Sequence, residues 1–335
     1  MIPESPRMAA PLLELKRMSK RFTTAPDTAA RITSLLRGGT AGQTVHAVDR
    51  VDLVIPEHEV VGLVGESGCG KSTLGRLAVG LLAPSEGMRL WRGVQLSNGA
   101  VTPTQQLKMQ MIFQDPHASL DPRLRVVDIV GEAPVVHGLI RRRQQVEYVS
   151  LQLNRVGLDP SLMRRFPHQF SGGQRARIGI ARALAVKPDF LVCDESVAAL
   201  DVSIRAQVLN LFMDLKSALS LTYLFISHDL GVVRHVSDRV VVMYLGRIVE
   251  SGPADAIFPA PNHPYTQALL AEVGKVEPKK RRFVPIRGEI PSPLSPPSGC
   301  HFHPRCPHAM ARCRETSPEL VEIAPGRSSA CYLNG

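Results

Sequence analysis

Short apolar runs recur along the chain and predict the strands of a sheet. The run at 60–64, Val-Val-Gly-Leu-Val, is apolar on both faces, which is typical of a buried parallel strand. The stretch at 12–18 alternates loosely and predicts a first strand that ends near Phe22. Further strands are predicted at 45–55, 109–113, 190–193, 222–226, 240–245 and 247–250.

Apolar residues at helical spacing separate these strands. Residues 126–165 are mostly helical in pattern, which predicts a helical subdomain inserted into the sheet domain. Residues 23–44, rich in Thr, Ala and Gly, predict a surface insertion. Three more helices are predicted from the apolar positions Leu74, Leu77, Ala78, Leu81 and Leu82, then Ile178, Ala181, Ala183 and Leu184, then Ile204, Val208, Leu211, Phe212, Leu215 and Leu219. This alternation predicts an α/β fold, a mixed sheet flanked by helices.

A glycine-rich loop joins the strand at 60–64 to the first of these helices. It matches the pattern G-x-x-x-x-G-K-[ST], whose backbone N–H groups wrap a phosphate at a helix N-terminus. We expect Lys71 to reach the β- and γ-phosphates and Ser72 to bind Mg²⁺. A chance glycine-rich turn is the alternative, but strand, loop and helix are all in place. The predicted ATP-binding residues of this loop are Gly65, Glu66, Ser67, Gly68, Cys69, Gly70, Lys71, Ser72 and Thr73.

Polar residues follow three of the predicted strands, where ligands gather in open α/β sheets. Asp194 and Glu195 come directly after a buried strand, which is costly unless they serve a function. We expect Asp194 to hold Mg²⁺ and Glu195 to act as the base for the attacking water. A structural ion pair is the alternative for these two acids. Gln114 ends another strand, and His228, which alone would suggest a structural histidine, is predicted to contact the γ-phosphate.

A second phosphate-binding turn is predicted where a helix begins at Ser171, Gly172, Gly173 and Gln174. It cannot bind the same γ-phosphate from the same side as the first loop. The sequence therefore implies that this turn serves the nucleotide of a partner subunit.

Composition bounds the class of protein. The chain has 335 residues, 44% of them hydrophobic and 21% charged, enough for one large α/β domain and an appendage. No apolar run is long enough to span a membrane, and the N-terminus lacks a signal-peptide core, so we expect an intracellular protein. The net charge of +10 is scattered, with small clusters at 141–143 and 279–282, and suits either solvated faces or an acidic partner.

Four of the six cysteines lie in the final 36 residues, after a Pro- and Lys-rich stretch at 274–298 that predicts a linker. In a reducing compartment, clustered cysteines favour metal binding over disulfides. Either a [4Fe–4S] cluster or Zn²⁺ suits four thiolates, and the absence of tight C-x2-C pairs favours the cluster. Free thiols are the alternative, and His301, His303 and His308 could substitute in a zinc site. The predicted ligands are Cys300, Cys306, Cys313 and Cys331.

Taken together, these motifs resemble the ATP-binding subunit of an ABC transporter. They follow the family order: the P-loop, Gln114 as the Q-loop, the signature at 171–174, Asp194 and Glu195 as Walker B, Asp201 in the D-loop, and His228 as the switch histidine. Phe22 lies where the family places its adenine-stacking aromatic. The sequences Phe-Gln-Asp-Pro at 113–116, Ser-Leu-Asp-Pro at 119–122, Leu-Asp-Val-Ser-Ile at 200–204 and His-Pro-Tyr-Thr at 263–266 narrow the resemblance to the oligopeptide/dipeptide importer branch.

The resemblance implies a P-loop NTPase (RecA-like) core and a set of boundaries. They are an N-terminal tail at 1–11, an ABC ATPase domain at 12–260 with its helical subdomain at about 115–168, and a Cys-rich C-terminal extension at 261–335. It implies ATP and Mg²⁺, the cation held through Ser72, Gln114 and Asp194. It also implies a second ATPase subunit, a paralogue in the first instance, whose nucleotide meets Ser171, Gly172, Gly173, Gln174 and Asp201. Two permease subunits and an extracytoplasmic binding protein complete the complex, at the cytoplasmic face of the inner membrane.

Two positions depart from the branch pattern, Ser196 and Ala198, and neither removes a reacting group, so hydrolysis is still expected. A transporter for another solute, such as nickel, is one alternative. A soluble ATPase acting on nucleic acid is another, although only 100 residues separate Lys71 from Ser171, too few for a long coiled-coil arm. A non-hydrolysing regulatory subunit is disfavoured because every catalytic position is filled.

Overall fold

The computed structural model describes residues 11–23, 43–96, 102–115, 119–271 and 288–334. They form two compact units. The first combines Met1–Pro56, Leu63–Asn98 and Arg239–Gly335, and the second combines Glu57–Gly62 and Gly99–Asp238. Nearly all of the predicted N-terminal tail and of the insertion at 23–44 lies outside the described residues, as do Pro116, the basic cluster at 279–282 and residues 274–287 of the predicted linker at 274–298.

An antiparallel sheet in the first unit has the strand order β2-β1-β4-β5. The predicted first strand is confirmed as β1, whose apolar side chains Leu13, Leu15 and Met18 are buried. The four strands are β1 (Leu13–Thr23), β2 (Thr44–Ile55), β4 (Glu86–Trp91) and β5 (Val94–Leu96).

Helix α2 (Lys71–Val79) follows the glycine-rich loop in the same unit and is shorter than predicted. Gly80 adopts the left-handed conformation (φ 80°), and its N–H bonds to the carbonyls of Arg76 and Leu77. This is how helices commonly end. Leu81, which the spacing placed on the helix, therefore lies beyond its end and is exposed.

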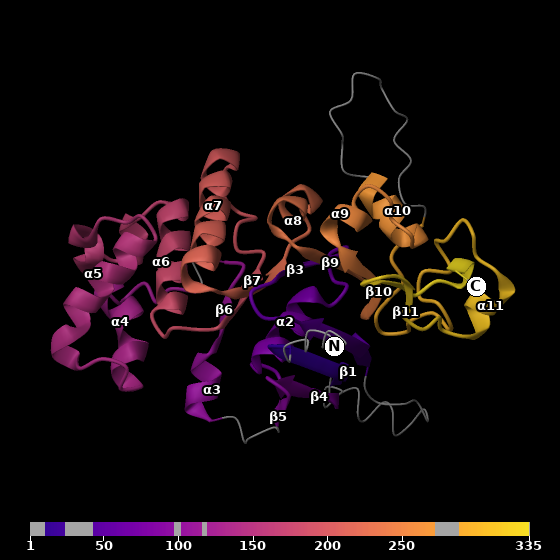
Figure 1. Ribbon diagram of the computed structural model, residues 1–335, viewed down its shortest axis with the longest axis horizontal. Coiled ribbons are helices and arrows are strands. Elements are labelled where there is room, and N and C mark those ends of the chain that lie inside the picture. The colour runs from indigo at the N-terminus through magenta and orange to yellow at the C-terminus, as the bar shows by residue number, and fades with distance from the viewer. Residues whose placement is uncertain (1–10, 24–42, 97–101, 116–118, 272–287, 335) are drawn as a thin grey trace, which may run out of the picture. The chain divides into compact units, whose positions relative to one another are not determined.

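The C-terminal region extends a second group of antiparallel strands in the first unit, in the order β11-β12-β10-β9 (Figure 1). Tyr244, Tyr265 and Phe302 pack together beside them, with ring centroids 4.6 to 5.4 Å apart. These three rings form an aromatic core between the strands and the C-terminal extension. From residue 239 onward the elements of the first unit are β9 (Arg239–Tyr244), β10 (Arg247–Pro253), α9 (Ala254–Ile257), α10 (Pro264–Ala271), α11 (Ala311–Glu315), β11 (Val321–Ala324), β12 (Arg327–Ser329) and a 3-10 helix, Tyr332–Asn334.

Parallel strands form the centre of the second unit. β6 (Met109–Ile112) pairs with β7 (Phe190–Asp194), and β7 pairs with β8 (Thr222–Ile226). Next to β8 comes β3 (Val60–Val64), whose first three residues belong to this unit. Every residue of β3, β7 and β8 is buried, as their continuous apolar runs predict. The mixture of parallel and antiparallel pairs confirms the predicted α/β class.

Helices of the second unit include α3 (Pro103–Leu107), α6 (Gly172–Leu184), α7 (Val202–Leu219) and α8 (Leu230–Val236). All four predicted apolar positions of α6 are buried. Of the predicted apolar positions of α7, Val208, Phe212 and Leu215 are buried, whereas the last one, Leu219, is exposed. None of the helices in the described residues is long and apolar enough to cross a membrane.

The helical region predicted at 126–165 is confirmed as α4 (Val126–Val136) and α5 (Gln145–Arg155), which pack on each other and on α6 (Figure 1). Val130, Val149 and Leu153 are buried between them. Short 3-10 helices connect these elements at Arg142–Gln144, Pro160–Arg164 and Pro167–Gln169.

Candidate active site

The glycine-rich loop of the first unit has the backbone that a phosphate cradle needs. Gly70 caps α2 with a φ of 106°, and a Cβ there would collide with the carbonyl oxygen of Ala47. Only glycine fits such a position without strain. Ser67 and Gly68, at the tip of the loop, are exposed. The loop therefore presents N–H groups and a helix N-terminus to solvent, where an anion can bind.

Lys71 is folded into this loop. Its Nζ donates to the carbonyl oxygens of Gly65 (2.8 Å) and Glu66 (2.9 Å), and the residue is 5% exposed. The ammonium group is thus held among the loop's own carbonyls. Ser72 and Thr73 follow it, half-buried, on the first turn of α2.

Two residues that the sequence did not single out as site residues contact the loop at Glu66. The backbone N–H of Glu66 donates to the Tyr265 hydroxyl at 2.9 Å, and Arg305 donates to both oxygens of its carboxylate, at 2.7 and 2.9 Å. This bonding to Glu66 raises the pKa of Arg305. The partners lie 199 and 239 residues from Glu66, so no local spacing could have indicated them.

Cys69 and Phe22 complete the predicted binding residues of this unit. Burial raises the pKa of the Cys69 thiol, which favours a neutral side chain under the loop. Phe22 lies near the end of β1 and is 40% exposed, with the Lys20 ammonium 5.1 Å from the ring centroid. An accessible ring suits the predicted stacking on adenine, which stays a prediction.

In the second unit, three of the predicted catalytic residues lie together. Gln114 Nε2 donates to Glu195 Oε2 at 2.9 Å, and His228 Nδ1 lies 3.3 Å from Glu195 Oε1. The Glu195 side chain is 15% exposed and that of His228 is 57% exposed. Strands β6, β7 and β8 run parallel, so their carboxyl ends meet at one edge and bring these residues into contact. Asp194, the last residue of β7, is 2% exposed.

The backbone at Glu195 is unusual for a residue other than glycine. Its φ is 46°, and its N–H donates to the Ile226 carbonyl at 3.0 Å. Such left-handed conformations cost free energy and concentrate at functional sites. Ser196 is one of the two positions that depart from the pattern of the importer branch. Its hydroxyl is buried without a hydrogen-bond partner among the described residues.

Arg205 on α7 positions two loops of this site. Its guanidinium donates to the carbonyls of Ala198 (3.3 Å) and Leu200 (3.1 Å), in the loop after Glu195. It also bonds Asp229 at 3.1 Å, the N-cap of α8 directly after His228. Arg205 follows the apolar position Ile204 of α7, and the sequence did not single it out as a site residue.

The predicted signature turn begins with two exposed residues, Ser171 and Gly172, and continues with two half-buried ones. Ser171 caps α6: its hydroxyl accepts from the Gln174 N–H at 3.3 Å, and its own N–H donates to Gln174 Oε1 at 3.0 Å. Gly173 lies against Ile204 of α7, where a Cβ would not fit easily. Asp201 is the exposed N-cap of α7. The predicted contact of residues 171–174 with a partner's nucleotide stays a prediction.

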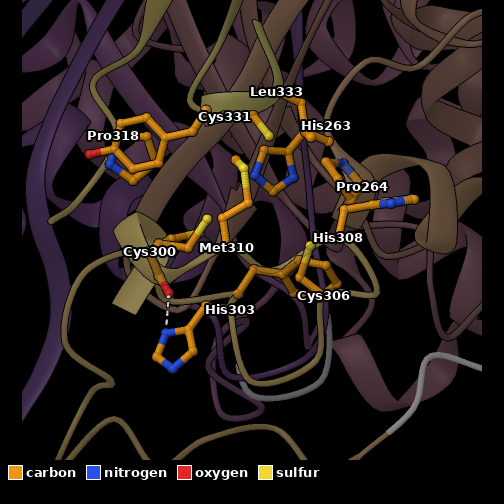
Figure 2. A pocket seen from close by; sticks show the side chains of 13 residues that line it. His263, Pro264, Cys300, His303, Cys306, His308, Met310, Pro318, Cys331 and Leu333 are labelled. Atoms are coloured by element: carbon orange, nitrogen blue, oxygen red, sulfur yellow. Dashed lines mark hydrogen bonds between the residues drawn. The ribbon is translucent and has the colours of Figure 1, made fainter. Parts of the chain in front are cut away.

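The four C-terminal cysteines line one pocket of the first unit (Figure 2). Burial, with neighbouring thiols adding to it, raises the pKa of Cys300 to about 11, so the thiol is neutral. His303 bonds the Cys300 carbonyl through Nδ1, at 3.0 Å. His301 instead faces the Leu245 carbonyl at 2.9 Å. The histidines that line the pocket are His263, His303 and His308.

These side chains do not form a metal site as they stand. Among the described residues, no three His, Cys, Asp or Glu side chains are grouped closely enough to hold a metal ion. The predicted [4Fe–4S] cluster or Zn²⁺ at Cys300, Cys306, Cys313 and Cys331 is therefore not confirmed. Neutral thiols pack well in such a pocket, since a protonated cysteine behaves as a small apolar side chain.

The fold and these groups define a class of protein, the P-loop ATPases of the ABC type. Residues 48–198 match the family model "ABC transporter", and residues 249–313 match "Oligopeptide/dipeptide transporter, C-terminal region". The Bacillus subtilis protein YkfD, a putative oligopeptide transport ATP-binding protein, is 50% identical over 299 residues, 87% of this chain and 90% of that protein. AppF, an oligopeptide transport ATP-binding protein of the same organism, is 49% identical over 86% of this chain and 90% of its own length.

Solved structures of ABC proteins share this fold. The structure of cbiO1 from Clostridium perfringens, part of the ABC transporter complex cbiONQ, has a TM-score of 0.60 at 25% identity and covers 75% of this chain and 92% of its own. The ATP-binding cassette MJ0796, at 24% identity and a TM-score of 0.59, shares the fold over 72% of this chain and 98% of its own. The chain belongs to the ABC transporter ATP-binding family, in its oligopeptide/dipeptide group, and is an ATP hydrolase.

Proposed function

We propose that this chain is the ATP-hydrolysing subunit of an ABC importer that takes up di- and oligopeptides. The observation that carries hydrolysis is the contact of Glu195 with Gln114 and His228. The peptide cargo is supported by the match of residues 249–313 to the oligopeptide/dipeptide transporter model and by the names of the most similar relatives.

In this mechanism the loop at 65–73 and Lys71 bind the phosphates of ATP. Ser72, Gln114 and Asp194 would hold Mg²⁺, which would supply positive charge against the phosphates. Gln114 donates to Glu195 through Nε2, which leaves its Oε1 for the cation. Glu195 accepts the proton of the attacking water, and His228 orients the γ-phosphate.

A second ATPase subunit supplies the other half of each site. Ser171, Gly172, Gly173 and Gln174 at the start of α6, with Asp201, contact the nucleotide that the partner's loop holds. The exposure of Ser171 and Gly172 supports this assignment, because a turn packed inside its own subunit could not reach a neighbour. The partner is a paralogue of this chain.

The complex also contains two permease subunits and an extracytoplasmic substrate-binding protein, and the chain lies peripherally at the inner membrane. The helical subdomain supports docking, since it exposes large apolar residues on α4 and α5. Val136, Val146 and Leu151 are 71%, 58% and 54% exposed. Exposed apolar side chains gathered on one subdomain are typical of interaction surfaces.

We propose that the four cysteines of this pocket hold a metal centre, either [4Fe–4S] or Zn²⁺. Four thiols lining one pocket support this proposal. Protein purified without oxygen should then be brown and contain iron and sulfide, or be colourless and contain zinc, and Cys313→Ser should lower the metal content. A colourless, metal-free preparation made without oxygen would contradict both.

Purification of the tagged chain from detergent-solubilised membranes tests the transport proposal. Two hydrophobic subunits should co-purify, and the ATPase rate of the complex should rise when peptide-loaded binding protein is added. Stimulation by nickel instead would indicate a different cargo. If the chain instead co-purifies with nucleic acid, and nuclease treatment removes that material, the transporter proposal is rejected.

A further inference from the structure

Glu66 joins the phosphate-binding loop to two residues of the C-terminal extension, Tyr265 and Arg305. Its N–H donates to the Tyr265 hydroxyl at 2.9 Å, and its carboxylate accepts hydrogen bonds from both terminal nitrogens of Arg305. Its carbonyl oxygen accepts from Lys71 Nζ at 2.9 Å and from the Cys69 N–H at 3.3 Å. One residue thus joins two C-terminal side chains to the lysine that binds phosphate.

The C-terminal partners are held rigidly. The Arg305 side chain is 4% exposed, and Tyr265 is fully buried. Their neighbour Tyr244 packs on Tyr265 at 4.6 Å between ring centroids, and its hydroxyl lies 3.4 Å from Arg305 Nη1. Because these groups are packed against one another, they hold Glu66 in one place.

Stability alone does not account for this ion pair. Removing two charges from water is costly, and buried pairs are often no more stabilising than apolar residues of the same volume. Arg305 Nε is also buried without a partner among the described residues. The favourable contacts of Arg305 are concentrated on Glu66, inside the loop that binds ATP.

We propose that Arg305 and Tyr265 are positioning residues for ATP binding, acting through Glu66 on Lys71. Without them Glu66 is free to turn, and Lys71 loses one of the two carbonyls that hold its ammonium group. The C-terminal region is then a working part of the nucleotide site. This inference rests on ATP binding at the loop and is independent of the cargo.

Because Arg305 and Tyr265 act on binding, the inference predicts a change in KM and Kd with little change in kcat. The variant Arg305→Gln should weaken ATP binding about tenfold, the usual effect of losing a hydrogen-bonded charge. Tyr265→Phe, which removes only the hydroxyl, should weaken it about threefold. The kcat at saturating ATP should stay within about twofold, since Glu195 is untouched. KM and kcat are measured on the complex that contains the second ATPase subunit, and Kd is measured on the purified full chain with a non-hydrolysable ATP analogue.

Arg327 offers a matched control in the same region. It bonds Glu250 of β10 at 2.9 Å, with side-chain exposures of 15% and 0%, and also donates to the Ala260 carbonyl. Arg327→Gln should lower the melting temperature and leave KM for ATP unchanged. Arg305→Lys, which keeps the charge, should restore part of the affinity, and Arg305→Gln should add little in a Glu66→Gln background.

An unchanged KM in both Arg305→Gln and Tyr265→Phe would overturn the inference, as would a loss of kcat alone. Tyr265→Phe keeps the test decisive if Arg305→Gln fails to fold. Failure of the wild-type chain to bind ATP would instead contradict the proposed function.

Discussion

The phosphate-binding loop of the first unit and the Glu195 cluster of the second are held in different ways. Lys71 is buried and bonded to two carbonyls of its own loop, and Glu66 is fixed by Tyr265 and Arg305. The Glu195 cluster depends instead on contacts between side chains at strand ends, one of them the exposed His228.

This difference fits the chemistry that we propose for each region. A phosphate is bound by many backbone donors, which must point inward before the ligand arrives. A base for hydrolysis must meet water, so it cannot be fully enclosed before the reaction. Mutations should therefore separate binding from turnover.

The largest effect is expected from Glu195→Gln. The amide cannot accept the proton, so the ATPase rate should fall by about 10² to 10⁴, the usual contribution of a general base, while ATP still binds. Turnover and nucleotide binding are measured on the same preparation. Glu147→Gln, the same change at an exposed position on α5, is the control and should leave the rate unchanged. Near-normal hydrolysis by Glu195→Gln would reject the base assignment.

The opposite pattern is expected from Lys71→Ala. Loss of the buried ammonium should weaken ATP binding about tenfold or more, because charge-assisted bonds to phosphate are the strong ones. Titration with a fluorescent ATP analogue measures this. Lys216→Ala on α7, which removes a surface ion pair with Asp238, should bind normally. Equal binding by both variants would contradict the role of Lys71.

A smaller effect, on the stability of the first unit, is expected from a fall in pH. Burial lowers the pKa of His263 to about 4 from an ordinary value of 6.5. Between these values the unfolded chain binds more protons, so the free energy of unfolding should fall as pH drops. We expect a loss of about 2 kcal/mol from this group between about pH 7 and about pH 5.

His263→Asn keeps an acceptor for the Tyr265 N–H and does not titrate, so urea unfolding of this variant in EDTA should depend less on pH than that of the wild type. Hydrogen exchange should locate the acid-induced loosening near α10. Identical pH profiles for the two proteins would show that His263 is not responsible.

The smallest effect on stability, about 1 kcal/mol, is expected from removing a helix cap. Ser171 and Thr102 both form capping boxes, on α6 and α3. Ser171→Ala and Thr102→Ala should destabilise the chain similarly. In the assembled complex, however, only Ser171→Ala should also slow ATP hydrolysis, because we propose that the Ser171 hydroxyl contacts the partner's nucleotide. Equal ATPase rates in the two variants would argue against that contact.

Much of the fold could be predicted because its signals are local. The buried runs at 60–64 and 222–226 became strands with the predicted bounds, and the convergence of Gln114, Glu195 and His228 followed from parallel strand ends. Errors arose where a single residue changed the outcome. Gly80 ended α2 early, since its left-handed backbone accepts the C-cap conformation and overrides the apolar spacing beyond it.

The residues that position the site could not be predicted in this way. Neither Arg205 nor Arg305 belongs to a motif that marks it as a site residue. Their roles depend on partners brought near by folding, Ala198 and Leu200 for one and Glu66 for the other.

By itself, the sequence determined the class of protein, the phosphate loop, the strand-end acids and the signature turn, because each is a short motif whose chemistry depends on adjacent residues. The tertiary structure alone decided that the C-terminal region contacts the loop and that the four cysteines share a pocket. Such contacts join residues as many as 239 positions apart, and they follow from packing rather than from periodicity.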